Sequence, residues 1–453
     1  MKQFTAIVVG AGARGKVYTD IMGDMSDKFK VVGVAEPIED RRIYTKEKHG
    51  IKDEYVFNTW EDMFAIPKFA DIAIITTLDR LHTAPAVKAL ELGYDLLLEK
   101  PVAPTPEECR LIRQTAKKYG RKVLVCHTLR YTPFLKTLKH FLDEGLVGEV
   151  MSVEHMECVG NAHFSHSFTR GNWSNSEESS FMLLQKCCHD LDALQWLLDK
   201  DCKRIQSFGS RSYFIPKNAP EGSPDYCIDG CPAGDDCPYN AMKLYYADKN
   251  NHWFRGVAAQ KPAGEETDCD VLKALRTTQY GKCVFKCNSD VVDHQTVNME
   301  FEGGTTATLT MSAFAKGDQT TGSRRIRVMG TKGDLIANLG VPEKEAFSFY
   351  DFKTCRREFL DVDFSKIMAG GNGIGSHAGG DEGLVADLYD YLTDALNAED
   401  LSEIEVSKLR SPEVNLDSKM EESCKLIKQI NPNIEGLDNS LEAIYKVVTY
   451  TYQ

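Results

Sequence analysis

The sequence predicts an α/β protein with two domains: a doubly wound parallel sheet first, then an α/β domain built on an open, mostly antiparallel sheet. Up to residue 128, short runs of β-branched residues alternate with amphipathic stretches, which is typical of βαβ units. Beyond residue 128, apolar residues recur with a period of two between turns. We therefore expect one domain over residues 1–128 and a second over residues 129–453.

The first domain contains five apolar runs that we expect to form its strands. They cover Ala6–Val9, Val31–Ala35, Ile72–Thr76, Asp95–Leu98 and Lys122–Cys126. A helix is predicted over Pro106–Tyr119, because Thr105 suits an N-cap, a proline suits the first helical position and two acids follow it.

The second domain begins with a predicted helix and continues with alternating strands. The apolar positions of that helix are Phe134, Leu135, Leu138, Phe141 and Leu142. A hairpin is predicted around Gly303-Gly304, with alternating apolar residues at Val297, Met299 and Phe301 before the turn and at Leu309, Met311 and Ala313 after it. Residues 210–290 are rich in Pro, Gly, Asp and Cys and fit neither element, so we expect an insertion there.

Charge and hydropathy exclude several classes of function. The formal net charge is -13 and the pI is near 5.4, which opposes nucleic-acid binding, because such proteins need a basic face. No apolar stretch approaches the roughly 20 residues that span a bilayer, and the first residues lead directly into a strand. We expect a cytoplasmic protein that binds a small molecule, without a nucleic-acid or membrane partner.

A glycine-rich loop follows the first predicted strand. Residues 10–15 read GAGARG and contain Gly10, Gly12 and Gly15 in the GxGxxG spacing, with Ala13 and Arg14 between the last two glycines. Between a strand and a helix this spacing makes a tight turn, admits a pyrophosphate and packs the helix on the strand. The pattern predicts a Rossmann domain that binds a dinucleotide.

Glu36 ends the second predicted strand, where a carboxylate accepts the ribose hydroxyls and repels a 2′-phosphate. This favours NAD over NADP. Arg14 and the pair Arg41-Arg42 argue for NADP, since a guanidinium can hold a 2′-phosphate, but a solvated helix face is the better interpretation of the pair.

Several ordered motifs resemble the glucose-fructose oxidoreductase, inositol dehydrogenase and rhizopine-catabolism (Gfo/Idh/MocA) family. They are GAGARG at 10–15, AEP at 35–37, TTLDRLH at 76–82, EKP at 99–101, HTLRY at 127–131, CCHDLDALQWL at 187–197 and GTKGDL at 330–335. The resemblance covers nearly the whole chain. It implies an NAD(P)-dependent sugar or polyol dehydrogenase in which Lys100 is the catalytic residue and His189 faces it.

Alcohol oxidation gives these residues a physical role. A hydride leaves carbon and a proton leaves oxygen, so an acid/base group has to lie beside the hydroxyl. Lys100 ends a strand, where open α/β sheets bind ligands. We expect the cofactor to contact the glycine loop and the strand ends through Gly10, Gly12, Ala13, Arg14, Gly15, Glu36, Thr76, Thr77, Leu78, His82, Glu99 and Lys100.

The chain departs from the family pattern next to His189. The family usually has an aspartate four residues before this histidine, whereas here the position is Gln185, followed by Lys186. On one continuous helix positions 185, 186 and 189 share a face, so we expect Lys186 to replace the acidic partner as a catalytic residue. This departure weakens a substrate assignment taken from inositol dehydrogenases.

Two polar and aromatic segments, residues 163–173 and 375–381, are expected to line the substrate pocket. Polyhydroxylated ligands suit aromatic platforms, bidentate donors and close backbone approach. The expected substrate residues are Arg170, Trp173, Gln185, His189 and His377. A loop with a core tryptophan and a helix cap is the structural alternative.

Five of the fourteen cysteines lie in the insertion: Cys227, Cys231, Cys237, and Cys283 with Cys287 on an expected strand. Four thiolates could hold a structural zinc, but usual pairs have two to four intervening residues, and Cys237 fits poorly. Iron–sulfur signatures are tighter still. Reduced cysteines that pack the insertion are the simpler interpretation, and we assign no metal from the sequence.

The sequence therefore predicts an oxidoreductase that moves a hydride between NAD and a hydroxyl carbon of a sugar, glycoside or cyclitol, with Lys100 as acid/base. One alternative is a redox-neutral glycosidase that oxidises, eliminates and re-reduces with bound NAD. Another is a non-catalytic NAD-dependent sensor. We expect a homo-oligomer, formed through the second domain's sheet.

Overall fold

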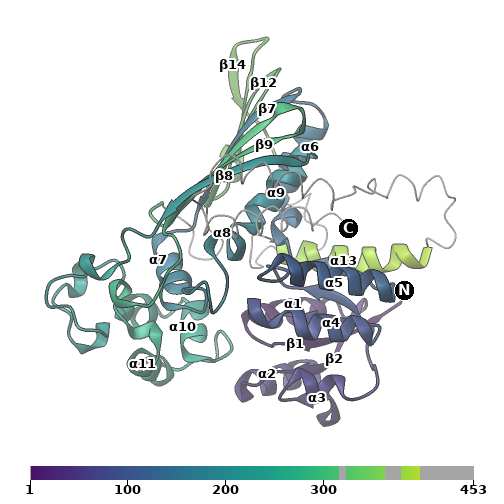
Figure 1. The fold of residues 1–453 in the computed structure, drawn as a ribbon, viewed down its shortest axis with the longest axis vertical. Coiled ribbons are helices and arrows are strands. Elements are labelled where there is room, and N and C mark those ends of the chain that lie inside the picture. Colours follow the sequence, from purple (N-terminus) through teal and green to yellow (C-terminus); the bar gives the residue numbers. More distant parts are fainter. Residues whose placement is uncertain (1, 316–322, 363–378, 398–453) are drawn as a thin grey trace.

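A computed structural model describes residues 2–315, 323–362 and 379–397. Two sheets dominate it, and an insertion of short helices extends to one side (Figure 1). The α/β fold class expected from the sequence is confirmed by the six-stranded parallel sheet and by the mostly antiparallel eight-stranded sheet.

The first sheet has the strand order β3-β2-β1-β4-β5-β6, and all its pairs are parallel. Its strands are β1 (Phe4–Val9), β2 (Phe29–Ala35), β3 (Val56–Phe57), β4 (Ile72–Ile75), β5 (Asp95–Leu98) and β6 (Val123–Val125). The order reverses between β1 and β4, and open α/β sheets bind ligands at such a switch point. The glycine loop follows β1 there.

The helices around this sheet are α1 (Ala13–Asp24), α2 (Glu39–His49), α3 (Trp60–Phe64), α4 (Thr83–Glu91) and α5 (Pro106–Tyr119). The predicted start of α5 is confirmed: the Thr105 side chain accepts a hydrogen bond from the backbone N–H of Glu108. Capping of this kind satisfies a backbone donor that the helix itself leaves unpaired.

The second sheet has the order β14-β13-β12-β11-β7-β10-β9-β8, in which only β7 and β10 pair in parallel among the described strands. Its strands are β7 (Val150–Cys158), β8 (Cys202–Ser210), β9 (His294–Phe301), β10 (Thr306–Ser312), β11 (Ser323–Gly330), β12 (Gly333–Asn338), β13 (Phe347–Asp351) and β14 (Arg356–Phe359). The predicted hairpin is β9–β10. Helices α6 (Pro133–Asp143) and α9 (Cys188–Leu198) cover one face of the sheet (Figure 1).

The insertion forms helices where the sequence indicated neither element. After α7 (Asn161–Phe164) and α8 (Met182–Gln185), the chain forms α10 (His252–Ala259) and α11 (Asp268–Thr277). Tyr245, Phe254 and Leu275 belong to a small apolar core of its own. The insertion also reaches the first domain, because Lys261 Nζ lies 2.6 Å from Asp40 Oδ2 on α2.

A helix near the C-terminal side of the described chain packs in the first domain. This helix, α13 (Gly380–Asn397), buries Leu384, Val385, Leu388 and Tyr389 in the same apolar core as β1 and β2. It packs beside α1, on the face of the first sheet opposite to α4 and α5. The Rossmann core is therefore completed by a segment more than 250 residues away in sequence from β6.

Replacing Leu388 with alanine tests this contribution. The side chain is 1% exposed, so the substitution removes buried methyl groups and leaves a cavity. We expect the free energy of unfolding to fall by about 2–5 kcal/mol, measured by chemical denaturation. Asp390→Ala on the exposed face of the same helix is the control and is expected to change stability little. Equal stabilities of the two variants would contradict the assignment of α13 to the core.

Candidate active site

The loop between β1 and α1 is folded tightly against the end of β4. Gly10 has a φ of +90°, and a Cβ there would lie 2.8 Å from the carbonyl oxygen of Thr76. A Cβ on Gly15 would lie 2.2 Å from the carbonyl oxygen of Gly10. Two of the three glycines are therefore required by the fold itself.

Gly12 differs from the other two. A Cβ there would meet only Arg41 Nη1, at an ordinary contact distance of 3.7 Å, and its φ of -69° suits any residue. The fold does not need a glycine here, but a phosphate that approaches the backbone does. Gly12 is also the N-cap of α1 and supplies no side-chain cap, so the helix start is available to an anion. The loop thus fits a dinucleotide pyrophosphate.

Glu36 lies against the glycine loop. Its carboxylate is 4% exposed and accepts hydrogen bonds from the backbone N–H of Ala11 at 2.7 Å and of Ile38 at 2.9 Å. This placement at the end of β2 fits the expected ribose acceptor. Arg42 donates to the carbonyl oxygens of Glu36 and Pro37, so its guanidinium caps the strand end from outside.

Arg14 and Glu99 form a salt bridge beneath the loop. Arg14 Nε donates to Glu99 Oε1 at 2.7 Å, and its Nη2 lies 2.5 Å from Asp381 Oδ1 at the start of α13. The other oxygen of Glu99 accepts the backbone N–H of Lys100 at 2.6 Å. Both predicted cofactor residues therefore fix the positions of the glycine loop and of Lys100.

The segment after β4 is held by His82 and Thr76. The buried ring of His82 lies 2.8 Å from the carbonyl oxygen of Pro101 and 3.0 Å from that of Thr77, and Thr76 Oγ1 donates to the carbonyl of Gly10. These bonds join the ends of β1, β4 and β5. Thr77 is partly exposed and Leu78 is exposed beside them.

Lys100 follows β5 and reaches toward the second domain. Its Nζ donates a 2.8 Å hydrogen bond to the backbone carbonyl of Gln185, the last residue of α8. A lysine side chain with one donor fixed in this way keeps two N–H groups for other acceptors. Lys100 is thus positioned between the carboxyl end of the first sheet and the start of α9.

His189 lies in the first turn of α9, and its ring is perpendicular to that of His127 at a centroid distance of 5.7 Å. His127 follows β6 and is 3% exposed. Neither of its ring nitrogens makes a hydrogen bond to the described residues, and Nδ1 lies 3.9 Å from Asp192 Oδ2. Burial lowers the pKa of His127, with Arg130 adding to the effect, so the imidazole is neutral at pH 7.

His127 was not among the residues expected at the site. It opens the HTLRY motif at the end of the sixth strand, and its position at a strand's carboxyl end was the signal that could have identified it.

Lys186 does not lie where the sequence suggested. Its Nζ pairs with Glu157 Oε1 at 3.3 Å, within a buried network in which Glu157 also binds Arg324. The expectation that Lys186 replaces an acidic partner of His189 assumed one continuous helix. Instead α8 ends at Gln185 and α9 begins at Cys188.

Gln185 and Trp173 hold a loop against the first domain. The Gln185 side chain bonds the Ser179 hydroxyl and the Trp173 carbonyl, and Trp173 Nε1 donates to Asp79 Oδ1 at 3.1 Å. The Ser180 hydroxyl donates to the other oxygen of Asp79. Residues 173–180 are therefore docked on the segment that follows β4.

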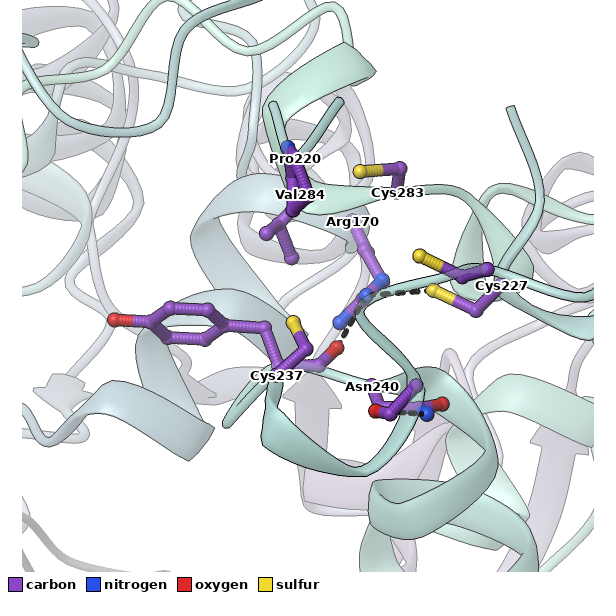
Figure 2. A pocket seen from close by; sticks show the side chains of 10 residues that line it. Arg170, Pro220, Cys227, Cys237, Asn240, Cys283 and Val284 are labelled. Atoms are coloured by element: carbon purple, nitrogen blue, oxygen red, sulfur yellow. Dashed lines mark hydrogen bonds between the residues drawn. The ribbon is translucent and has the colours of Figure 1, made fainter. Parts of the chain in front are cut away.

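Arg170 precedes the insertion of residues 210–290 in sequence, but its side chain points into it. Its Nε and Nη2 donate at 2.7 Å to the carbonyl oxygens of Lys282 and Tyr239, and it is 1% exposed (Figure 2). The expected contact with a substrate beside Lys100 is therefore replaced by a role in the insertion. His377, the other expected substrate residue, lies outside the described residues.

Two glycine substitutions separate cofactor binding from folding. Gly12→Ala is expected to weaken NAD binding by about tenfold or more, which is about 1.4 kcal/mol, because the methyl group occupies the phosphate's approach while the fold has room for it. Its melting temperature should match wild type. Gly15→Ala, which clashes with the backbone of Gly10, is expected to melt lower. Calorimetric titration and thermal unfolding measure both, and unchanged NAD affinity in Gly12→Ala would contradict the phosphate cradle.

Two family models match the chain. Residues 4–127 match the NAD-binding Rossmann fold of the Gfo/Idh/MocA oxidoreductase family, and residues 139–354 match its C-terminal alpha/beta domain. A Bacillus subtilis (strain 168) protein, YteT, described only as an oxidoreductase, is 23% identical over 82% of this chain and 84% of its own.

Other curated relatives match over shorter lengths. The inositol 2-dehydrogenase of Salmonella typhimurium is 23% identical over 45% of this chain and 57% of its own, and the 2,7-anhydro-N-acetylneuraminate hydratase of Escherichia coli K12 is 26% identical over 45% and 51%. The chain thus spans little more than half the length of these two relatives.

Among solved structures, levoglucosan dehydrogenase in complex with NADH and levoglucosan aligns with a TM-score of 0.62 at 16% identity, covering 87% of this chain and 90% of that one. This likeness supports the fold. Together with the two family models and the dinucleotide cradle at Gly12, it leads to one conclusion: the chain belongs to the Gfo/Idh/MocA family of NAD-binding oxidoreductases.

Proposed function

We propose that the chain is an NAD-dependent dehydrogenase of a sugar, glycoside or cyclitol, in which Lys100 transfers the proton of the reacting hydroxyl. The observation that carries the proposal is the meeting of Lys100, Gln185, His127 and His189 beside the cofactor edge of the first sheet. A dehydrogenase needs one proton-transfer group next to the hydride acceptor and donors that orient a polyol.

The first domain supplies the cofactor site. Gly12 and the start of α1 would receive the pyrophosphate, and Glu36 would accept the ribose hydroxyls, which favours NAD over NADP. Bound NAD accepts or returns the hydride of the substrate carbon. Arg14 supports this site through its bonds to Glu99 and Asp381, and its contact with the dinucleotide stays a prediction.

Lys100 has the position and the donors that proton transfer requires. Its backbone is fixed by Glu99, and the Gln185 carbonyl holds its Nζ at 2.8 Å, so the side chain has little freedom to leave the site. In the oxidative direction the neutral amine of Lys100 would take the hydroxyl proton onto its lone pair, and in reduction the protonated form would return that proton to the oxygen.

His127 and His189 are proposed to bind the neighbouring hydroxyls. The ring of His127 is buried and neutral, and its nitrogens make no hydrogen bond to the described residues, which suits a group whose acceptor and donor are completed by a polyol. Trp173, held by Asp79, is proposed to supply an apolar wall.

The relatives support the substrate class. Inositol and levoglucosan are both compact polyhydroxylated rings, and the proteins named for them share this family or fold. We extend that class, and no particular member of it, to this chain.

We also propose a cytoplasmic location and a homo-oligomer formed through the second sheet. Among the described residues, no helix has the length and apolar character needed to cross a membrane.

A redox-neutral reaction is the second candidate, favoured by the anhydro-sugar hydratase among the relatives. In such a reaction oxidation at one carbon acidifies the adjacent C–H, elimination expels a leaving group, and the hydride returns after addition of water. Lys100 would serve the first and last proton transfers equally well.

Product stoichiometry separates the two candidates. The protein is incubated with NAD and a panel of cyclitols, glycosides and anhydro-sugars, and NADH absorbance and released sugar are followed together. A dehydrogenase is expected to form one NADH for each molecule oxidised. If sugar is released or hydrated without net NADH, the dehydrogenase proposal is wrong and the redox-neutral reaction is supported.

Lys100→Ala tests the acid/base assignment. Turnover is expected to fall by about 10²- to 10⁴-fold, because a positioned acid/base is lost, while the NAD dissociation constant stays near wild type. Lys88→Ala, an exposed lysine on α4, is the control. Steady-state kinetics and NAD titration measure both effects. Wild-type turnover in Lys100→Ala would refute the role of Lys100.

A further inference from the structure

The insertion encloses a buried charge that has no carboxylate partner. Arg170 lines a cavity there and is 1% exposed, yet no described Asp or Glu forms an ion pair with it. Its Nη1 makes no hydrogen bond to a described residue. Buried charges are normally paired, because an isolated ion loses its hydration without compensation.

Four cysteines line the same cavity. They are Cys227, Cys231, Cys237 and Cys283. Figure 2 shows the side chains of Cys227, Cys237 and Cys283 around the Arg170 guanidinium. Arg170 Nη2 donates toward Cys227 Sγ at 3.8 Å.

The surrounding chain is irregular. Between residues 216 and 240 the described structure has only three-residue 3₁₀ turns, and one isolated bridge, Tyr226 with Lys282, joins it to the segment that carries Cys283. Cys283 itself precedes a 3₁₀ turn, not the strand expected from the sequence. The buried residues of the apolar core around α10 and α11 lie outside this segment, whereas Tyr239 and Val284 pack into the core of the second domain. Because the segment has few helix or sheet hydrogen bonds, a metal that cross-links it would add stability.

We propose that Cys227, Cys231, Cys237 and Cys283 bind one structural zinc ion, and that Arg170 is the cation that offsets part of the negative charge of this centre. Zinc with four thiolates carries a net charge of about -2, since four thiols release their protons to solvent as Zn²⁺ binds. Arg170 supplies an opposite charge and an N–H donor to a ligand sulfur, which is the usual work of an outer-shell residue.

Zinc binding requires the cysteine side chains to turn toward one another. As they stand, no three His, Cys, Asp or Glu donors among the described residues are grouped closely enough to hold an ion. Each cysteine turns about a single side-chain bond, and none of the four lies in an α-helix or a strand. Because Arg170 ends the π-helical turn Ser165–Arg170, the centre would join the insertion to the second domain.

Metal content is the first test. The full-length protein is purified under reducing conditions without chelators and with zinc in the growth medium. About one equivalent of zinc per chain is expected. Cobalt(II) added to the demetallated protein is expected to give thiolate-to-cobalt charge-transfer bands and the visible bands of tetrahedral cobalt. Less than about a tenth of an equivalent, a cobalt spectrum without thiolate bands, or iron with labile sulfide would overturn the proposal.

Three variants assign the ligands. Cys231→Ser is expected to lose zinc and the cobalt bands, whereas Cys269→Ser, an exposed cysteine on α11, is expected to keep both. Arg170→Met is expected to lower zinc affinity by about 10- to 100-fold, in the range of outer-shell residues. Full zinc binding by Cys231→Ser would contradict the ligand set. If that variant does not fold, the cobalt spectrum of the wild type still decides.

Discussion

The salt bridge of Arg14 with Glu99 and Asp381 fixes the parts of the first domain that the chemistry needs. It joins the glycine loop, the end of β5 and the start of α13 in one place. Glu99 uses its second oxygen to hold the backbone of Lys100, so the glycine loop and Lys100 share one support. Removing such a partner from a buried carboxylate typically lowers stability by about 3–5 kcal/mol. Independent movement of the glycine loop and Lys100 would break this salt bridge and is therefore unfavourable.

The second domain holds its side of the site with a separate buried network. Asp190, next to His189, accepts hydrogen bonds from Arg324 and from His155, and Glu157 lies between Arg324 and Lys186. Burial alone would raise the pKa of Asp190, but Arg324 and His155 hold it below its usual range, so the carboxylate stays ionised. This network fixes the first turn of α9 on the sheet and therefore the position of His189.

The sequence could predict those elements whose signals come from residues close together in the chain. The strands of the first sheet, α5 with its Thr105 cap and the β9–β10 hairpin depend on neighbours within a few residues, and all are present. The place of α13 depends on a core that lies hundreds of residues earlier, so no periodicity indicates it.

The site residues show the same limit. The helix-face argument for Lys186 assumed one continuous helix, whereas the chain breaks its helix between residues 185 and 188, and the apolar face of α9 alone does not reveal that break. Arg170 was expected at the substrate because a guanidinium is a bidentate donor in a segment expected to line the pocket. The turn at residues 165–170 directs its guanidinium into the insertion instead.

The two networks meet only through contacts between the domains, and these differ in strength. Asp79, 3% exposed, binds Trp173 and Ser180 near the expected nicotinamide end, and Lys100 binds the Gln185 carbonyl there. At the other end, the pair of Lys261 with Asp40 is exposed and contributes only about 0–1 kcal/mol. Breaking a buried hydrogen bond when the domains separate costs more free energy than breaking a solvated ion pair. The domains are therefore held most firmly around Lys100 and Asp79, and we expect the exposed contact between Lys261 and Asp40 to yield first if they separate.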